Sequence, residues 1–255
     1  MFTIGTDSEV AIHDKKTYRS IIGIINGSKH NPVLTPFGNI QEDNVFAEFA
    51  INPVDNEREW VKLITDAKKH LEQLLNPLGF DIHINSCIEL PDFELANPEV
   101  WEFGCEPDYN AYSGRQNPRP ENPGNRRVAG GHIHVGHTGA LKDRSKRWLI
   151  KYMDLYLGLP SVILDNTPES RERRLFYGKA GSFRPKPYGV EYRTLSNFWI
   201  QDESLMKWAF QQTTKAVAAF EKKPMYEEVD LRPIINAGDV HRAYELVKEY
   251  NVCKL

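Results

Sequence analysis

The segment that most constrains the fold of this chain is residues 129–136, Ala-Gly-Gly-His-Ile-His-Val-Gly. Apolar and imidazole side chains alternate in it, and this alternation predicts a β-strand, because successive strand side chains point to opposite faces of a sheet. Ile133 and Val135 then face a core, whereas His132 and His134 share the other face. Glycine on both flanks leaves room for close approach to the backbone. Two neighbouring imidazoles on one face of a sheet indicate a site for a metal or an anion. The alternative is that they are polar residues on the solvent-exposed face of an antiparallel sheet.

The same alternation recurs in three other segments. Asp7 and Glu9 share one face of a strand near the N-terminus, and Glu48 is the one carboxylate of a strongly apolar strand. Glu191 and Arg193 share a face of a fourth strand. These patterns predict a sheet with one polar and one apolar face, with helices behind the apolar face. Carboxylates together with imidazole suit hard divalent ions such as Mg²⁺ or Mn²⁺.

The other periodic segments predict strands at residues 2–12, 18–26, 44–51 and 80–90, a short edge segment at 32–36, helices at 57–77, 142–158 and 203–221, and one or two more helices between 226 and 250. The helix over 57–77 carries an apolar stripe at helical spacing, formed by Trp60, Ile64, Ala67, Leu71 and Leu74. Leu159-Pro160 is expected to end the helix over 142–158. Residues 91–126 lack a regular pattern, and a loop this long inside a compact domain is usually functional or mobile.

The composition is that of an ordinary globular protein, with 40% hydrophobic and 26% charged residues in 255. This length fits a single domain spanning residues 1–255. A net charge of −3 and a pI near 6.3 give no sign of a nucleic-acid partner, and no apolar run approaches membrane-spanning length. Cys87, Cys105 and Cys253 lack paired or zinc-like spacing, so reduced thiols in the cytoplasm are the simplest account. The sequence does not indicate the oligomeric state.

A basic, glycine-containing segment at residues 173–188 precedes the strand of Glu191. Its Lys179, Arg184 and Lys186 are suited to holding phosphates at the rim of a sheet. Their spacing differs from that of a Walker-type loop. The segment therefore predicts phosphate contacts only in combination with the neighbouring strands.

The four polar strands together resemble a known superfamily. Asp7-x-Glu9, Glu48, His132-x-His134-x-Gly136 and Glu191-x-Arg193 are similar, in this order, to the arrangement in glutamine synthetase and glutamate–cysteine ligase. Within that superfamily, Gly-Gly-His-Ile-His-Val-Gly and Tyr-Gly-Val-Glu-Tyr-Arg-Thr-Leu-Ser-Asn resemble the compact phage-type COOH–NH2 ligases, the type 2 amidoligases. The resemblance covers about residues 5–200. It implies an α+β fold like the glutamine synthetase catalytic domain, with a curved, mainly antiparallel sheet, helices on one face and an open polar face.

The resemblance further implies an enzyme, an ATP-dependent amidoligase that holds more than one Mg²⁺ (or Mn²⁺) ion on the open face. The implied metal ligands are Asp7, Glu9, Glu48, His132 and Glu191. The family usually has two glutamates where this chain has Asp7 and Glu9. The implied catalytic and phosphate contacts are His134 and Arg193, with Arg184 and Lys179 as additional phosphate contacts.

The chemistry of amide formation favours such a residue set. A carboxylate is a poor electrophile at neutral pH, whereas the acyl phosphate formed with the γ-phosphoryl group of ATP can be attacked by an amine. Phosphoryl transfer needs positioning and positive charge more than a protein nucleophile. The incoming ammonium must also lose a proton to a base. Glu106 and Asp108 are candidates for this base, with a structural or solvent-facing role as the alternative for both.

Two alternative functions remain open at this point. A His-x-His strand with carboxylates also occurs in metal-dependent hydrolases, although the other histidines of the chain show no supporting pattern. A non-catalytic binding module with a retained ligase fold is the second alternative. A ligase would act on small-molecule or peptide carboxylates and amines, whose identity the sequence does not specify. Dependence on ATP separates the ligase from the hydrolase.

Overall fold

The computed structural model describes residues 2–102, 108–118, 124–139, 141–223 and 229–253. A ten-stranded sheet forms its centre, in the order β3-β4-β5-β1-β10-β12-β11-β8, with β2 and β6 both paired to β1. All of its strand pairings are antiparallel. The strands of this sheet are β1 (Phe2–His13), β2 (Tyr18–Arg19), β3 (Val33–Thr35), β4 (Gly38–Asp43), β5 (Phe46–Ile51), β6 (Asp81–His83), β8 (Tyr109–Asn110), β10 (Gly131–His137), β11 (Ser182–Lys186) and β12 (Gly189–Tyr192). β7 (Cys87–Glu89) and β9 (Arg126–Val128) form a separate pair.

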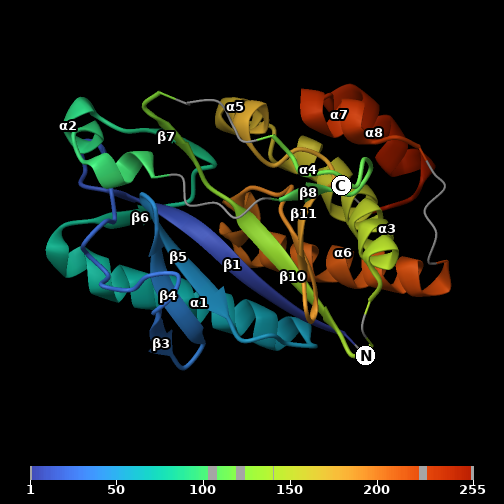
Figure 1. Cartoon of the computed structure of the whole chain (residues 1–255), viewed down its shortest axis with the longest axis horizontal. Helices are drawn as coiled ribbons and strands as arrows, with labels where there is room; N and C mark the ends of the chain where they lie inside the picture. Colours follow the sequence, from blue (N-terminus) through green and yellow to red (C-terminus); the bar gives the residue numbers. More distant parts are fainter. Residues whose placement is uncertain (1, 103–107, 119–123, 140, 224–228, 254–255) are drawn as a thin grey trace.

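The α-helices are α1 (Glu57–Leu75), α2 (Asp92–Leu95), α3 (Asp143–Met153), α4 (Leu159–Leu164), α5 (Pro168–Phe176), α6 (Glu203–Lys222), α7 (Arg232–Ala237) and α8 (Val240–Glu249). Shorter helical turns are η1 (Asn76–Leu78), η2 (Pro98–Trp101), η3 (Asp154–Gly158) and η4 (Asn197–Ile200). In Figure 1 the long helices α1 and α6 run behind the sheet, and β1, β5 and β10 cross in front of them. The predicted α+β class, with a large antiparallel sheet and several helices, is confirmed.

The apolar face of the sheet packs on these helices. Ile133 and Val135 of β10 are fully buried in one core cluster, as the alternation predicts. Trp60 of α1 stacks on Trp199 of η4 with ring centroids 5.3 Å apart, which joins the helical layer to the sheet. The opposite face of β1 and β10 is thereby left for polar side chains.

The predicted helix over 57–77 is α1, which ends at Leu75 and continues into η1. The side chain of Asn56 accepts a hydrogen bond from the backbone N–H of Glu59, so it caps the helix. One residue of the predicted stripe is wrong, because Leu74 is exposed and Leu75 is fully buried. Leu75 follows the buried Leu71 by four residues, which keeps it on the same helix face.

Leu159-Pro160 does not end the second helix as predicted. The chain passes from α3 through the π-helical turn η3 directly into α4, where Pro160 lies in the first turn. Proline is tolerated there because it follows the π turn, where Leu159 bonds to Asp154 five residues back and the regular α-helical bonding is already interrupted. The wide π turn places Asp154 in the core, where its carboxylate accepts a hydrogen bond from the hydroxyl of Tyr192 at 2.8 Å.

The predicted strand over 18–26 is also mostly wrong, since only Tyr18–Arg19 pairs with β1. The following residues turn around Glu42, whose carboxylate accepts the backbone N–H groups of Gly23, Ile25 and Asn26. Positive φ values of 80° at Gly23 and 59° at Asn26 are incompatible with a continuing strand.

The remaining differences concern short elements. The expected strand over 80–90 is two short strands, β6 and β7, and the irregular segment over 91–126 contains α2, η2, β8 and the first residue of β9. The sequence analysis did not predict β4, α5 or β11. The edge strand β3 and the helices α6, α7 and α8 lie where they are predicted.

In the described part of the chain, none of the helices has the length and apolar character needed to cross a membrane. Cys87 and Cys253 are free thiols. Cys105 lies outside the described residues.

Candidate active site

The strand register brings the polar side chains of these four strands together on one face of the sheet. Asp7 of β1 lies opposite His132 of β10, and His134 of β10 lies opposite Glu191 of β12. On the other side of β1, Glu9 lies opposite Glu48 of β5. The shared polar face predicted from the alternation is therefore present, because the part of β1 that carries Asp7 and Glu9 lies between β5 and β10.

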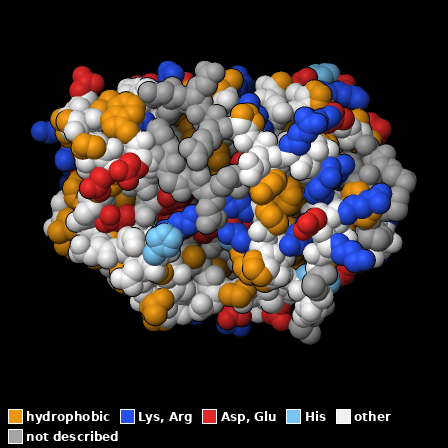
Figure 2. All heavy atoms as spheres, viewed as in Figure 1, with side chains coloured by type: hydrophobic (Ala, Val, Ile, Leu, Met, Phe, Trp, Pro, Cys, Tyr) orange, Lys and Arg blue, Asp and Glu red, His pale blue; other side chains and the backbone are white. Residues whose placement is uncertain are grey.

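This face forms the floor of one large cavity of about 1510 Å³. The sequence-predicted residues that line it are Asp7, Glu9, Glu48, His132, His134, Lys179, Arg184 and Arg193. Figure 2 shows acidic and basic side chains meeting near the centre of the face that carries β1 and β10 in Figure 1. Glu191 is fully buried beneath this surface.

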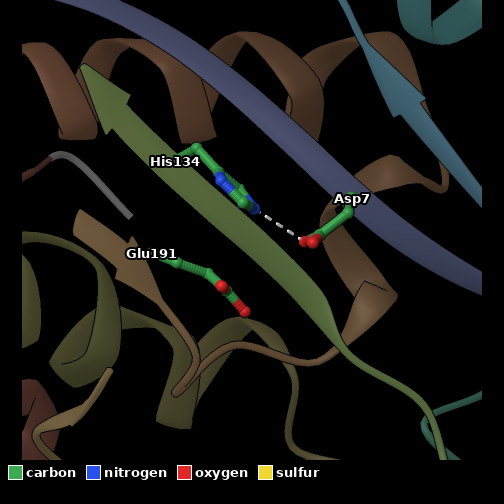
Figure 3. Close-up of side chains that lie close together, drawn as sticks. All are labelled: Asp7, His134 and Glu191. Atoms are coloured by element: carbon green, nitrogen blue, oxygen red, sulfur yellow. Dashed lines mark ion pairs between the residues drawn. The ribbon is translucent and has the colours of Figure 1, made fainter. Parts of the chain in front are cut away.

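Asp7, His134 and Glu191 form the first group of possible metal ligands, with one ligand atom of each within 4.8 Å of the others. Figure 3 shows Asp7 and His134 pointing toward each other from β1 and β10, with the Glu191 carboxylate in the same space. The Nε2 atom of His134 lies 3.0 Å from Asp7 Oδ1, and its Nδ1 lies 2.6 Å from the hydroxyl of Tyr188. Burial alone would raise the pKa of Asp7, but His134 and His132 outweigh it and hold that pKa well below its usual value.

His132 lies deeper than His134. Its Nδ1 is 3.1 Å from Asp7 Oδ1 and 3.8 Å from Glu191 Oε1. Burial, together with the nearby Arg193 guanidinium, lowers the pKa of His132 to about 3, so the ring is neutral. Its Nε2 atom is buried and has no hydrogen-bond partner among the described residues. A neutral imidazole with Nδ1–H directed at a carboxylate leaves Nε2 as a lone-pair ligand, a common arrangement at metal sites.

Glu191 is surrounded by cations. Its Oε2 lies 2.7 Å from Lys186 Nζ, and its Oε1 lies 3.3 Å from Arg184 and in direct contact with Arg193. Burial still raises the pKa of Glu191 above its usual value, although Arg184 and Lys186 act in the opposite direction. Glu191 is thus the shared ion-pair partner of three basic side chains, which we call the cationic group.

A second group of possible metal ligands consists of Glu9, Asp43 and Glu48, again within 4.8 Å of one another. Burial and the neighbouring Asp43 raise the pKa of Glu9 to about 8. Burial and Asp7 raise the pKa of Glu48 well above its usual value. Gln41 donates to Glu48 Oε1 at 2.9 Å. We call these three carboxylates the acidic group.

Four of the predicted metal ligands therefore divide between the two groups, Asp7 and Glu191 in the first and Glu9 and Glu48 in the second, whereas His132 belongs to neither. A hard divalent cation prefers oxygen ligands, and these three carboxylates, two of them buried and Asp43 half-buried, fit such an ion because it would offset their mutual repulsion. The Nε2 atom of His132, buried and without a partner among the described residues, is a further possible ligand on the same cavity floor. These residues fit an Mg²⁺ or Mn²⁺ ion.

Asp43 and Tyr188 are site residues that the sequence analysis missed. Asp43 comes from β4, whose alternating Asn39, Gln41 and Asp43 all line the cavity and are the sequence signal that was available. Tyr188 lies in the tight turn between β11 and β12, and nothing in its local sequence indicates a contact with His134. Only the pairing of β12 with β10 brings the two together.

Gly130 and Gly131, at the start of β10, allow other groups of the protein to pack closely against the backbone. A Cβ atom on Gly130 would collide with the ring of His132. A Cβ on Gly131 would lie 2.5 Å from the backbone oxygen of Ser196. The predicted close approach therefore occurs, and the approaching groups are the chain's own.

Only one of the two candidates for the general base lies among the described residues. Asp108 lines the cavity. Glu106 lies outside the described residues.

Comparison with protein families supplies an independent result. Residues 121–245 match the model of a family described as phage phiEco32-like COOH.NH2 ligase-type 2. The match includes His132, His134, Lys179, Arg184, Glu191 and Arg193, whereas Asp7, Glu9 and Glu48 precede it. A search of curated proteins found no match. The resemblance to the phage-type COOH–NH2 ligases that the sequence motifs indicate is thus confirmed over residues 121–245.

Proposed function

We propose that this protein is an ATP- and Mg²⁺-dependent carboxylate–amine ligase, which forms an amide or peptide bond through an acyl phosphate. The family match supports ligation of a carboxyl and an amino group. The observation that carries the rest is the division of one cavity floor into an acidic group and a cationic group. Such a division suits a metal–triphosphate complex, whose two components carry opposite charges.

The proposed reaction has two steps. A carboxylate oxygen of the first substrate attacks the γ-phosphorus of ATP, the bond between that phosphorus and the β–γ bridging oxygen breaks, and ADP leaves. The nitrogen of the amine then attacks the carbonyl carbon of the acyl phosphate, and inorganic phosphate leaves. The amine must lose a proton to a base, and the cavity-lining Asp108 is the described candidate.

The cationic group is suited to the phosphates. Arg193 offers a buried planar guanidinium, and Arg184 and Lys186 lie beside it around Glu191. Lys179 lines the same cavity. Burial alone would lower the pKa of His134, but Asp7 outweighs it and raises that pKa above its usual value. Charge placed where it develops during phosphoryl transfer is the main protein contribution to such reactions.

The acidic group is suited to the metal. Glu9, Asp43 and Glu48 would hold the ion, with Asp7 and His132 as neighbouring ligands. When bound, a divalent ion neutralises charge on the transferring phosphoryl group.

Hydroxylamine provides a test that does not require the natural amine, because it traps acyl phosphates as hydroxamates. The purified protein would be incubated with ATP, Mg²⁺, hydroxylamine and a panel of amino acids and short peptides, with ADP and hydroxamate measured. We expect equimolar ADP and hydroxamate with at least one carboxylate, and none with chelator. Arg193→Ala should abolish the reaction, whereas Arg242→Ala on the exposed face of α8 should not.

Amide hydrolysis without ATP would instead support the metal-dependent hydrolase. Failure to consume ATP with any carboxylate of the panel, by a protein that binds Mg²⁺, would count against the ligase.

A further inference from the structure

Tyr177 lies against two guanidinium groups at the edge of the cationic group. The centroid of its ring is 5.1 Å from Cζ of Arg193 and 5.3 Å from Cζ of Arg173. The ring also meets the ring of His132 edge-on, with centroids 6.1 Å apart. Tyr177 thus contacts one cavity-floor arginine and one arginine of the scaffold.

Arg173 is fixed in place by the backbone. Its guanidinium donates to the backbone oxygens of Ala129, Thr194 and Leu195 at 2.7, 2.9 and 2.8 Å, and the residue is buried. Those oxygens belong to the loops that adjoin β10 and β12. Arg173 therefore ties α5 to the two strands that carry the site.

The turn after Tyr177 is shaped for this arrangement. Gly178 has a φ of 70°, and a Cβ atom there would collide with the guanidinium of Arg173. Glycine is required at such a position both for its left-handed backbone and for the missing side chain. The backbone of Tyr177 is therefore fixed by its hydrogen bond to Arg173 of α5 before it and by the left-handed Gly178 after it.

The aromatic face stabilises the cations beside it. A guanidinium over a tyrosine ring is attracted by the negative charge of the ring face, and the attraction grows when the pair is desolvated. Arg193 has Glu191 on one side and the open cavity on another. The ring of Tyr177 supplies a further wall that restricts where the guanidinium can lie.

We infer that Tyr177 is a positioning residue for Arg193, which holds the guanidinium in the orientation needed to contact the transferring phosphoryl group. The inference rests on the proposed function. The ring carries this role, since the Tyr177 hydroxyl is buried and makes no hydrogen bond to any described residue. Phenylalanine should therefore replace Tyr177 with little effect, and an aliphatic side chain should not.

The test uses Tyr177→Phe, Tyr177→Leu and Tyr177→Met, each alone and combined with Arg193→Lys. We expect kcat for Tyr177→Phe within about twofold of the wild type, and a fall of roughly 5- to 30-fold for the aliphatic variants, the scale of one desolvated cation–π contact. In the Arg193→Lys background the same change should have a much smaller effect, because residues that act together are not additive. KM for the carboxylate should change little.

Pyrophosphate binding by calorimetry gives a readout independent of turnover. We expect the aliphatic variants to bind pyrophosphate several-fold more weakly than Tyr177→Phe. If this difference appears without any ligase turnover, the proposed function fails and the positioning role stands.

Three results would overturn the inference. Folded aliphatic variants with wild-type kcat and pyrophosphate affinity would show that Arg193 does not need the ring. Equal loss in Tyr177→Phe would assign the effect to the hydroxyl. Failure of both aliphatic variants to fold, judged by circular dichroism, would make Tyr177 a stability residue.

Discussion

Glu9 and Glu48 lie directly opposite each other on the paired strands β1 and β5, and both carboxylates are buried. Ionised carboxylates at directly opposed positions of an antiparallel pair destabilise the sheet, and the raised pKa values of both groups reflect the cost of keeping them ionised. The protein keeps the two groups together, with Asp43 beside them. A bound divalent cation would turn this repulsion into attraction.

Glu48→Gln should therefore make the metal-free protein more stable and remove its response to metal. We expect the melting temperature in chelator to rise by roughly 2–4 °C, the equivalent of about 1 kcal/mol for a chain of this size. Added Mg²⁺ or Mn²⁺ should raise the melting temperature of the wild type and leave the variant unchanged. Glu249→Gln on exposed α8 is the matched control and should respond to metal like the wild type. A variant that still responds fully to metal would remove Glu48 from the metal site.

Glu191→Gln should cost both stability and activity. Glu191 is fully buried and compensates Arg184, Lys186 and Arg193. Removing one member of a buried charge cluster leaves the others uncompensated, with a typical loss of about 3–5 kcal/mol. Urea denaturation should show this loss, and added pyrophosphate should recover more of it in the variant than in the wild type, because an anion replaces the missing charge. A variant with unchanged stability would contradict the buried cluster.

Arg193→Lys tests the guanidinium itself, since lysine keeps the charge and loses the planar fork. If Arg193 contacts the transferring phosphoryl group, kcat should fall on the order of 10- to 1000-fold, the scale of losing one well-placed donor. Metal affinity should change little. A large loss of thermal stability or metal binding with kcat intact would instead make the contact with Glu191 purely structural. Arg242→Lys on α8 serves as the control.

Asp154 should make stability depend on pH near neutrality. Burial raises its pKa from 3.8 to about 7 in the folded protein. Between these values the folded state holds a proton that the unfolded chain has released, so the free energy of unfolding falls as the pH rises through this window. Asp154→Asn keeps an oxygen to accept from Tyr192 and cannot ionise. Relative to the wild type, the variant should gain stability between pH 5 and pH 8, by on the order of 2–4 kcal/mol.

Urea denaturation at pH 5 and pH 8 measures this difference directly. The two proteins should have different slopes of stability against pH, with the wild type losing more toward pH 8. Parallel slopes would mean that Asp154 does not titrate in this range.

Local sequence was sufficient to identify the strands of the site and their faces. The period of two in β1, β5, β10 and β12 assigned each side chain to the core or to the polar face, and burial of Ile133 and Val135 agrees. Helical spacing located α1 and α6 in the same way. These features depend on neighbours within one element, so the period of the pattern carries them.

Short elements could not be predicted because their stability comes from distant parts of the chain. The turn after β2 is organised by the carboxylate of Glu42, which lies on β4. Helix α4 begins at Leu159, with Pro160 in its first turn, immediately after a π turn that buries Asp154 against β12. Such contacts between distant residues override local propensity.

The sequence by itself determined which side chains share a polar face, and only the tertiary structure decided which of them meet. Strand alternation says nothing about register or strand order, which are set by the pairing of segments far apart in the chain. Placing β1 between β5 and β10 sets Glu9 against Glu48 and Asp7 against His132, and so divides one predicted ligand set into two groups. The same long-range pairing brings cations from β11 around Glu191 and buries it.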